Sequence, residues 1–300
     1  MADLKVLRKI RDDHMTISDD DVVNLTFHSL QEAVDVAEKM LDSGNRHVSS
    51  PGKDFDERRD WSGNVTAREA FDLATYGWEE GGAKGDGVAR DALSLIEGEV
   101  EDMAFSQTWD VAGSEVDVGA YCLGTPECMI EYEPVTISRA GRVVSLVASV
   151  CYSGAIDTQT IMNRGAYITG LAQALQRTGH EVELWAYIPV HSPVTKKQAQ
   201  VRVLVKGTKD VVDPSRIAWA FSHPSSLRVV GFLLMGAFPE DRQWPGYGSV
   251  DEPKQDQPEG TIYLPSLSSD SRNESQHQAM LKILQDLGLV KEDHNPDDLR

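Results

Sequence analysis

The stretch VVSLVASVC, residues Val143–Cys151, decides the fold of this chain. It is an apolar run of strand length, rich in β-branched valine, which is typical of a strand buried on both faces of a parallel sheet. Apolar residues at helical spacing follow over Thr160–Thr178, and Gly179 provides a helix stop. Val182–Ile188 has the composition of a second strand. A strand, a helix and a strand joined by short loops predict a parallel pair with a right-handed crossover.

The sequence downstream of this unit continues the alternation of strands and helices. Strands are predicted at Ala199–Val205, Val229–Met235 and Ile262–Leu264, and helices at Pro214–Ala220 and Gln276–Leu287. The fold class is therefore α/β, with an open, mostly parallel sheet and flanking helices, preceded by a mainly helical region with a small β part.

The N-terminal region is predicted to be mainly helical. Ser29 and Thr66 each precede an apolar helical pattern and have a glutamate three residues later, so capping boxes should start helices there. The glycine-rich EEGGAKGDG, Glu79–Gly87, lacks the spacing of a phosphate-binding loop and is interpreted as a turn into a helix over Val88–Met103. Short strands and turns are expected between Thr108 and Thr136.

These patterns predict four segments along the chain. Residues 1–25 form a flexible arm, and residues 26–140 form an acidic, mainly helical region with short strands. Residues 141–265 form the α/β domain, and residues 266–300 form a C-terminal helix and an acidic tail.

The net charge of −19 is unevenly distributed. Residues 1–140 contain 13 Lys and Arg against 30 Asp and Glu, whereas residues 141–250 contain 11 against 7. The acidic flanks argue against general adhesion to nucleic acid, while the mildly basic middle leaves a local contact open. No apolar run approaches the length of a membrane span, and the first residues lack the apolar core of a secretory signal. Three cysteines without such a signal predict a cytoplasmic protein, with no contact to a membrane.

The predicted site lies where the first strand ends, because open α/β sheets bind ligands at the carboxyl ends of their strands. The partner-binding surface is predicted to comprise Tyr152, Ser153, Gly154, Met235, Gly236 and Phe238. Cys151 precedes a long helix and is a candidate nucleophile, with His180, His191 and His223 as candidate bases. The alternative is a buried cysteine that closes an apolar strand.

The order of elements from about residue 142 to residue 265 resembles a von Willebrand factor A-type domain. The resemblance rests on the strand ending in Cys151-Tyr152-Ser153-Gly154-Ala155, on Arg164-Gly165-Ala166, and on ALQRTGHEVELW ending at Trp185. The family implies an Asp-x-Ser-x-Ser motif that holds a divalent cation, and a later strand ending in Thr-Asp-Gly. Here Cys151 stands at the aspartate and Ala155 at the second serine, and the later turn reads Met235-Gly236-Ala237. One hydroxyl cannot anchor Mg²⁺ or Ca²⁺, so no metal and no cofactor are expected.

Other N-terminal pieces, such as Trp61-Ser62-Gly63 and Gly124-Thr125-Pro126, are similar to uncharacterised proteins of tailed bacteriophages. The resemblance implies a phage-encoded protein acting in the host cytoplasm. We therefore expect a non-enzymatic protein-interaction or scaffold protein built on a metal-free A-type domain. Two alternatives stay open: a nucleic-acid-associated protein that uses the middle domain, and a cysteine-dependent enzyme centred on Cys151.

Overall fold

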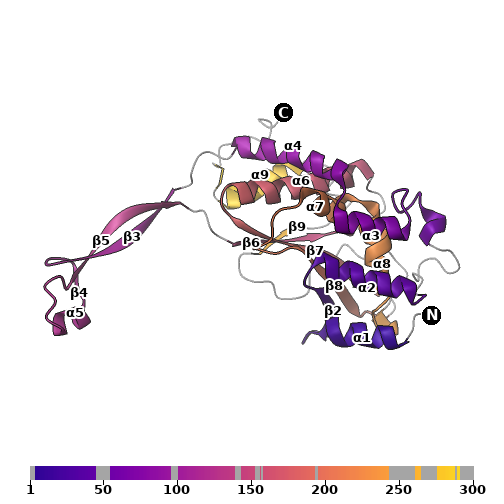
Figure 1. Cartoon of the computed structure of the whole chain (residues 1–300), viewed down its shortest axis with the longest axis horizontal. Helices are drawn as coiled ribbons and strands as arrows, with labels where there is room; N and C mark the ends of the chain where they lie inside the picture. The colour runs from indigo at the N-terminus through magenta and orange to yellow at the C-terminus, as the bar shows by residue number, and fades with distance from the viewer. Residues whose placement is uncertain are drawn as a thin grey trace. The chain divides into compact units, whose positions relative to one another are not determined.

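The computed structural model describes residues 4–44, 55–95, 101–138, 143–152, 156, 158–192, 195–242, 261–264, 276–287 and 289–290. The chain divides into two compact units (Figure 1). We call Met1–Ile96 together with Val143–Arg300 the α/β unit, and Glu97–Arg142 the hairpin unit. Each is described by itself.

A six-stranded sheet forms the centre of the α/β unit, in the order β1-β2-β8-β7-β6-β9. Its strands are β1 (Met15–Ile17), β2 (Val22–Phe27), β6 (Val143–Ser149), β7 (Glu181–His191), β8 (Gln198–Lys206) and β9 (Ile262–Leu264). The pairs β2–β8, β6–β7 and β6–β9 are parallel, whereas β1–β2 and β7–β8 are antiparallel. The mixed α/β class with a mostly parallel sheet is confirmed, and the likeness to an A-type domain stays a prediction.

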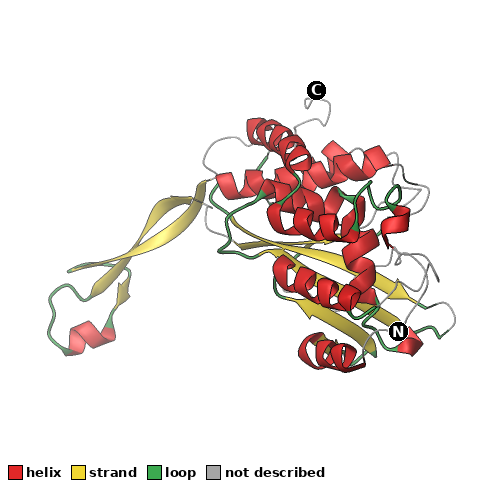
Figure 2. Cartoon of the chain, turned by 45° about the vertical axis from the view of Figure 1, so that its right-hand side comes forward, coloured by secondary structure: helices red, strands yellow, loops and turns green. Residues whose placement is uncertain are grey.

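Helices surround this sheet, as Figure 2 shows. They are α1 (Leu4–His14), α2 (Leu30–Asp42), α3 (Ala67–Tyr76), α4 (Glu79–Leu95), α6 (Thr158–Arg177), α7 (Pro214–Ser222), α8 (Phe232–Met235) and α9 (Gln276–Asp286), with the short turns η1 (Phe55–Arg58), η2 (Ser226–Gly231) and η3 (Glu240–Arg242). The order β6, α6, β7 with a parallel pair confirms the central prediction from residues 143–188. The predicted caps are also present, because Ser29 Oγ accepts from Glu32 N and Thr66 forms a complete capping box with Glu69.

Both faces of the central strands are buried, because consecutive residues such as Leu146 and Val147 of β6 are shielded from solvent. Alternate residues of β7, including Ala186 and Ile188, contact a small apolar cavity that is also lined by Leu30 of α2, Trp219 of α7 and Val230 of η2. The cavity measures about 30 Å³, so these side chains pack closely around it. Burial of this apolar surface is the main stabilising contribution to the unit.

The prediction that Glu79–Gly87 forms a turn is wrong, because these residues begin helix α4. The glycines serve close helix packing: a Cβ on Gly82 would lie 2.6 Å from Ser215 Oγ, and one on Gly85 would lie 2.5 Å from Thr169 Cγ2. Gly170 of α6 makes the reciprocal approach to Val88. Glycine is unfavourable in an isolated helix, but here its missing side chain lets α4 approach α6 and α7 closely.

The predicted strand Val229–Met235 is also wrong, because η2 and α8 make this segment helical. Its apolar residues are buried on all sides, and periodicity alone cannot separate a buried strand from a buried helix. Met235-Gly236-Ala237 therefore ends a helix, so the expected correspondence with a strand-end turn of A-type domains fails at this position.

Residues 4–25 are folded, unlike the flexible arm expected for residues 1–25. Strand β2 lies inside the sheet between β1 and β8, with Val23 and Leu25 buried. The acidic residues before β2 suggested an exposed arm, but they form the turn that leads into it. The N-terminal and middle regions thus share one sheet, and the predicted boundary near residue 140 instead coincides with the end of the hairpin unit.

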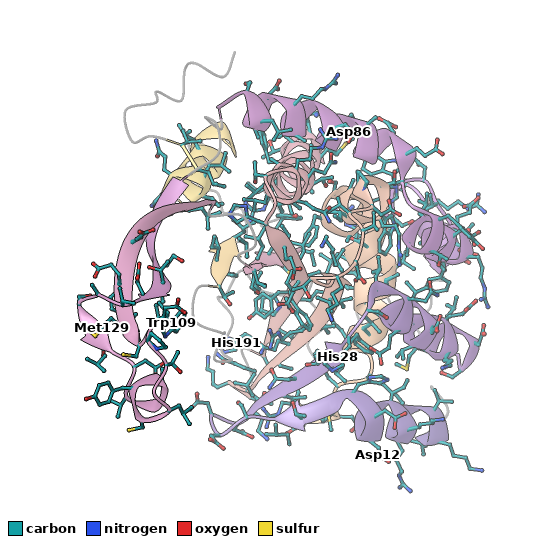
Figure 3. All side chains as sticks on the ribbon, turned by 60° about the vertical axis from the view of Figure 1, so that its left-hand side comes forward. Asp12, His28, Asp86, Trp109, Met129 and His191 are labelled. Carbon is teal, nitrogen blue, oxygen red and sulfur yellow. The ribbon has the colours of Figure 1, made fainter. Side chains whose placement is uncertain are left out.

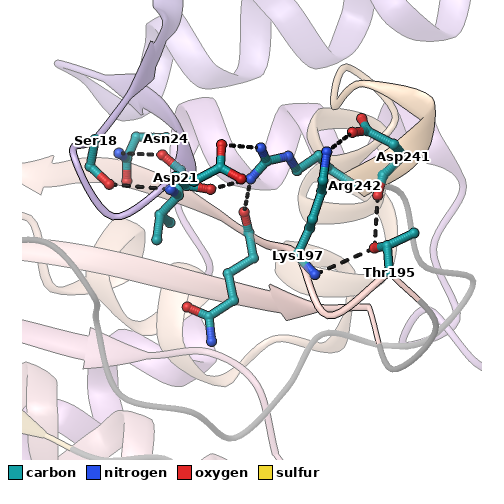
Figure 4. Close-up of polar contacts among 9 residues, drawn as sticks. Ser18, Asp21, Asn24, Thr195, Lys197, Asp241 and Arg242 are labelled. Carbon is teal, nitrogen blue, oxygen red and sulfur yellow. Dashed lines mark hydrogen bonds and ion pairs between the residues drawn. The ribbon is translucent and has the colours of Figure 1, made fainter.

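Arg242 holds this turn in place (Figure 4). Its guanidinium is 6% exposed and donates to the Asp21 carbonyl, to Asp21 Oδ1 at 2.5 Å and to the Gln198 carbonyl at 3.1 Å. Next to it, Lys197 Nζ lies 2.5 Å from Asp241 Oδ2, and Thr195 Oγ1 donates to the Asp241 carbonyl. The charged groups at these strand ends bind one another, which is a structural role.

Candidate functional site

In the described residues, the predicted site at the end of β6 is closed. Cys151 is 1% exposed, and burial raises the pKa of its thiol far above the usual range. Tyr152 Oη donates to the Phe221 carbonyl at 2.9 Å, and burial raises its pKa to about 12. Ser153 and Gly154 lie outside the described residues.

The second half of the predicted surface is buried as well. Met235 is 4% exposed and Phe238 is fully buried. The carbonyls of Ala237 and Phe238 accept hydrogen bonds from Arg11 of α1, at 2.7 Å and 2.9 Å. Gly236 lies between these residues, at the end of α8. In this conformation the side chains of Met235 and Phe238 are too buried to contact a partner.

The cysteine chemistry suggested by the sequence finds little support in this geometry. A nucleophilic cysteine needs a lowered pKa, whereas the Cys151 thiol stays protonated at neutral pH. Of the candidate bases, His223 is engaged elsewhere, because its Nδ1 lies 2.8 Å from Ser225 Oγ. The arrangement around Cys151 is that of a buried side chain at the end of an apolar strand.

The hairpin unit presents a different kind of surface. Strands β3 (Glu101–Asp110) and β5 (Met129–Ser138) pair in antiparallel register over ten residues each, and β4 (Glu115–Val116) adds to β5. The helix α5 (Val118–Cys122) connects β4 to the return strand. We call Trp109–Met129 the hairpin tip.

Backbone and polar side-chain hydrogen bonds define the tip. Asp117 caps α5 by accepting from Ala120 N at 3.0 Å, and its second oxygen accepts from Trp109 Nε1 at 3.2 Å. These bonds, led by the one from Ala120, lower the pKa of Asp117. Gly124 ends the turn after α5 with a φ of +73°, a conformation that favours glycine. A Cβ on Gly113 would lie 2.6 Å from the Ile130 carbonyl, so that close approach requires glycine.

Large apolar side chains of this unit face solvent. Among the described side chains of residues 106–133, none is buried. The exposed fractions are Trp109 50%, Val111 66%, Val116 44%, Val118 66%, Tyr121 67% and Leu123 86%. Figure 3 shows the Trp109 and Met129 side chains on the two strands where the tip begins. A set of exposed apolar side chains concentrated in one small unit marks an interaction surface more often than scattered single residues do.

The surface is also strongly acidic. From Glu101 to Ser138 the chain contains eight Asp and Glu and no Lys or Arg. Tyr132 Oη donates to Glu115 Oε2 at 2.7 Å, and this hydrogen bond raises the pKa of Tyr132. The sequence between residues 101 and 138 therefore places carboxylates among the apolar residues without a compensating Lys or Arg.

Within the described residues, no group of three or more His, Cys, Asp and Glu side chains could hold a metal ion, and Cys122 and Cys128 of the tip are free thiols. No described helix has the length and apolar character needed to cross a bilayer.

The alternating apolar residues of the hairpin did not predict this exposed surface, although its composition could have indicated it. Trp109, Val111, Val116, Val118 and Tyr121 alternate loosely, as half-buried strands do, and such a pattern predicts a buried face. The structure instead leaves these side chains exposed, because the described part of the hairpin unit has one three-stranded sheet and no second layer packed on it. The absence of Lys and Arg over the same residues was the stronger indication of a specialised surface.

Comparison with known proteins assigns the chain to a family without assigning an activity. The family described as a domain of unknown function (DUF7192) matches residues 9–291, so the chain belongs to this family. No curated protein and no solved structure matches the chain.

Proposed function

We propose that this protein is a non-enzymatic interaction protein that binds a protein partner through the hairpin tip. The observation that carries the proposal is the exposure of six large apolar side chains on a unit whose described side chains form no core. Water contact with this much apolar surface is unfavourable, and docking onto a partner would remove it.

The hydrogen bonding of the tip supports the same proposal. Asp117, the Trp109 indole and the backbone turns fix the shape of the tip without using the side chains of the residues that follow Asp117 in α5. Val118, Tyr121 and Leu123 are thus displayed on a preformed scaffold, and a partner would not bear the full entropic cost of ordering them.

This proposal moves the interaction surface away from the strand edge around Tyr152 and Phe238. Binding to nucleic acid and cysteine chemistry at Cys151 remain alternatives without comparable support. The hairpin carboxylates would repel phosphates, and the Cys151 thiol is buried.

Site-specific photo-crosslinking in the native cells tests the proposal. A photoreactive residue replaces Leu123 in one full-length variant and Val211 in the other. The two positions match, because each side chain is 86% exposed and Val211 belongs to the α/β unit. We expect a discrete protein adduct from position 123 that is absent from position 211.

A second pair of variants checks the side chains themselves. Tyr121→Ser in the tip should reduce the adduct from position 123, whereas Tyr76→Ser should leave it unchanged. Tyr76 is a suitable control because it is 80% exposed at the end of α3. Equal adducts from positions 123 and 211, or no adduct from position 123, would contradict the proposed function.

A further inference from the structure

The charge of the hairpin unit limits which class of molecule can bind its tip. Residues 97–142 contain ten Asp and Glu and two Arg, a balance of −8, which leaves −11 for the rest of the chain. A second copy of this chain is therefore a poor partner for the tip. The remainder of that copy has a net negative charge, and contact between two tips would bring like charges together. Nucleic acids and anionic lipid surfaces are repelled for the same reason.

The carboxylates lie where a docked partner would meet them. Glu131 and Glu133 are exposed on β5, next to the tip, and they share one face of the strand because side chains alternate along it. Glu115, Asp117 and Glu127 lie within the tip, among the apolar side chains. No Lys or Arg of the hairpin competes for them between residues 101 and 138.

We infer that the partner is a different protein whose docking surface is basic, with an apolar pocket surrounded by Lys and Arg. The apolar side chains Val118, Tyr121 and Leu123 enter the pocket, and the surrounding carboxylates pair with the cations. This inference rests on the proposed function and adds the chemical class of the partner. Complementary charge of this kind mainly accelerates association and selects the partner, while the buried apolar contacts hold the complex.

The test measures the adduct from the photoreactive residue at position 123 in a lysate of the native cells, where the ionic strength can be set, while the charge of the hairpin is changed. Glu131→Gln combined with Glu133→Gln removes two carboxylates next to the tip and leaves the apolar side chains intact. Asp12→Asn combined with Asp13→Asn removes the same charge from exposed positions of α1 and serves as the control. Both proteins are used as the full chain.

The hairpin variant is expected to lower the adduct yield about fivefold at low salt, and the α1 control should retain the original yield. Raising the ionic strength from about 0.05 M to about 0.5 M should lower the yield of the unmodified hairpin in the same way, because the Debye length shortens. A zero-length carbodiimide, which joins a carboxylate to a lysine amine, should link Glu131 or Glu133 to a lysine of the same partner.

The outcomes separate the inference from the proposed function. An adduct from position 123 that responds to neither charge removal nor salt would overturn the basic-surface inference and leave the interaction function standing. An adduct that contains only this chain would show a second copy on the tip, and an adduct lost on nuclease treatment would indicate nucleic acid; both overturn the inference. Absence of the adduct counts against the proposed function itself.

Discussion

The indole of Trp109 and the carboxylate of Asp117 join two parts of the hairpin tip. Trp109 Nε1 donates to Asp117 Oδ2 at 3.2 Å, while Oδ1 of the same carboxylate accepts from Ala120 N at 3.0 Å. One side chain thus caps the first turn of α5 and anchors it to the end of β3. The position of α5, and with it the display of Tyr121 and Leu123, depends on this carboxylate.

Replacement of Asp117 by alanine should loosen α5 without unfolding the protein. The substitution removes the helix cap and leaves the Trp109 indole without this partner, so the last turn of the tip should open more often. Amide hydrogen exchange measures the effect: residues 118–124 should exchange several-fold faster, and β6 and β7 should be unchanged. Glu127→Gln removes a nearby exposed carboxylate and is the control. Unchanged exchange in the Asp117→Ala protein would show that the backbone turns alone hold α5.

Two glycines of α4 should respond in opposite directions to the same substitution. A Cβ on Gly85 would lie 2.5 Å from Thr169 Cγ2, inside the packed contact with α6, whereas a Cβ on Gly87 would have nothing within 4 Å. Gly85→Ala should lower the free energy of unfolding by about 1–3 kcal/mol through overpacking. Gly87→Ala should raise it by about 0.5–1 kcal/mol, because alanine is the better helix former. Urea unfolding of both variants measures the difference, and destabilisation by both would contradict the packing argument.

The glycines of α4 also show which parts of the fold could be predicted from the sequence and which could not. The strands and helices of residues 143–222 could be predicted from their apolar pattern, as over Val143–Cys151, and the start of α3 could be predicted from its cap at Thr66. The first half of α4, Glu79–Gly87, could not be predicted as helix, because glycine is a poor helix former and its presence there is explained by residues of α6 and α7 far along the chain. Local preference is overridden where a close helix contact supplies the stabilisation.

The site was harder to predict than the fold. The rule that ligands bind at strand ends pointed to Tyr152 and Phe238. The sequence does not show that the Tyr152 hydroxyl donates to the Phe221 carbonyl, or that Arg11 donates to the Phe238 carbonyl. The exposure of the hairpin tip could not be predicted from its alternating apolar residues, because alternation normally accompanies a second packing layer. Its composition, with eight acidic residues and no basic one from 101 to 138, was visible from the start.

A buried hydrogen-bond chain after α7 yields a further prediction on stability. Trp219 Nε1 donates to Ser225 Oγ at 3.1 Å, and Ser225 Oγ lies 2.8 Å from His223 Nδ1. Ser225→Ala would leave a buried indole N–H and a buried imidazole nitrogen without this hydroxyl, at a cost of about 1–3 kcal/mol. Ser226→Ala, at the half-buried neighbouring position, is the control and should change the free energy of unfolding much less. Equal effects of the two variants in urea unfolding would argue against the hydrogen-bond chain.

His223 should make the stability of the fold depend on pH. Burial lowers its pKa from the ordinary 6.5 to about 4. The backbone N–H of Ser225 also points at Nδ1, at 3.3 Å, so this nitrogen is an acceptor and the neutral ring carries its proton on Nε2. The unfolded chain binds a proton near pH 6.5 and the folded chain only near pH 4, so the stabilising contribution is complete above pH 6.5 and is lost as pH falls towards 4. The total loss amounts to about 3 kcal/mol.

Comparison with His223→Asn isolates this contribution, because asparagine keeps a polar atom near the position of Nδ1 but does not titrate. The free energy of unfolding of the unmodified protein should fall more steeply between pH 7 and pH 4 than that of the variant, since the carboxylates contribute equally to both. Lys39→Gln, at the last turn of α2, is a control that should leave the slope unchanged. Parallel pH profiles for the unmodified and His223→Asn proteins would show that His223 gains its proton as easily in the folded chain as in the unfolded one.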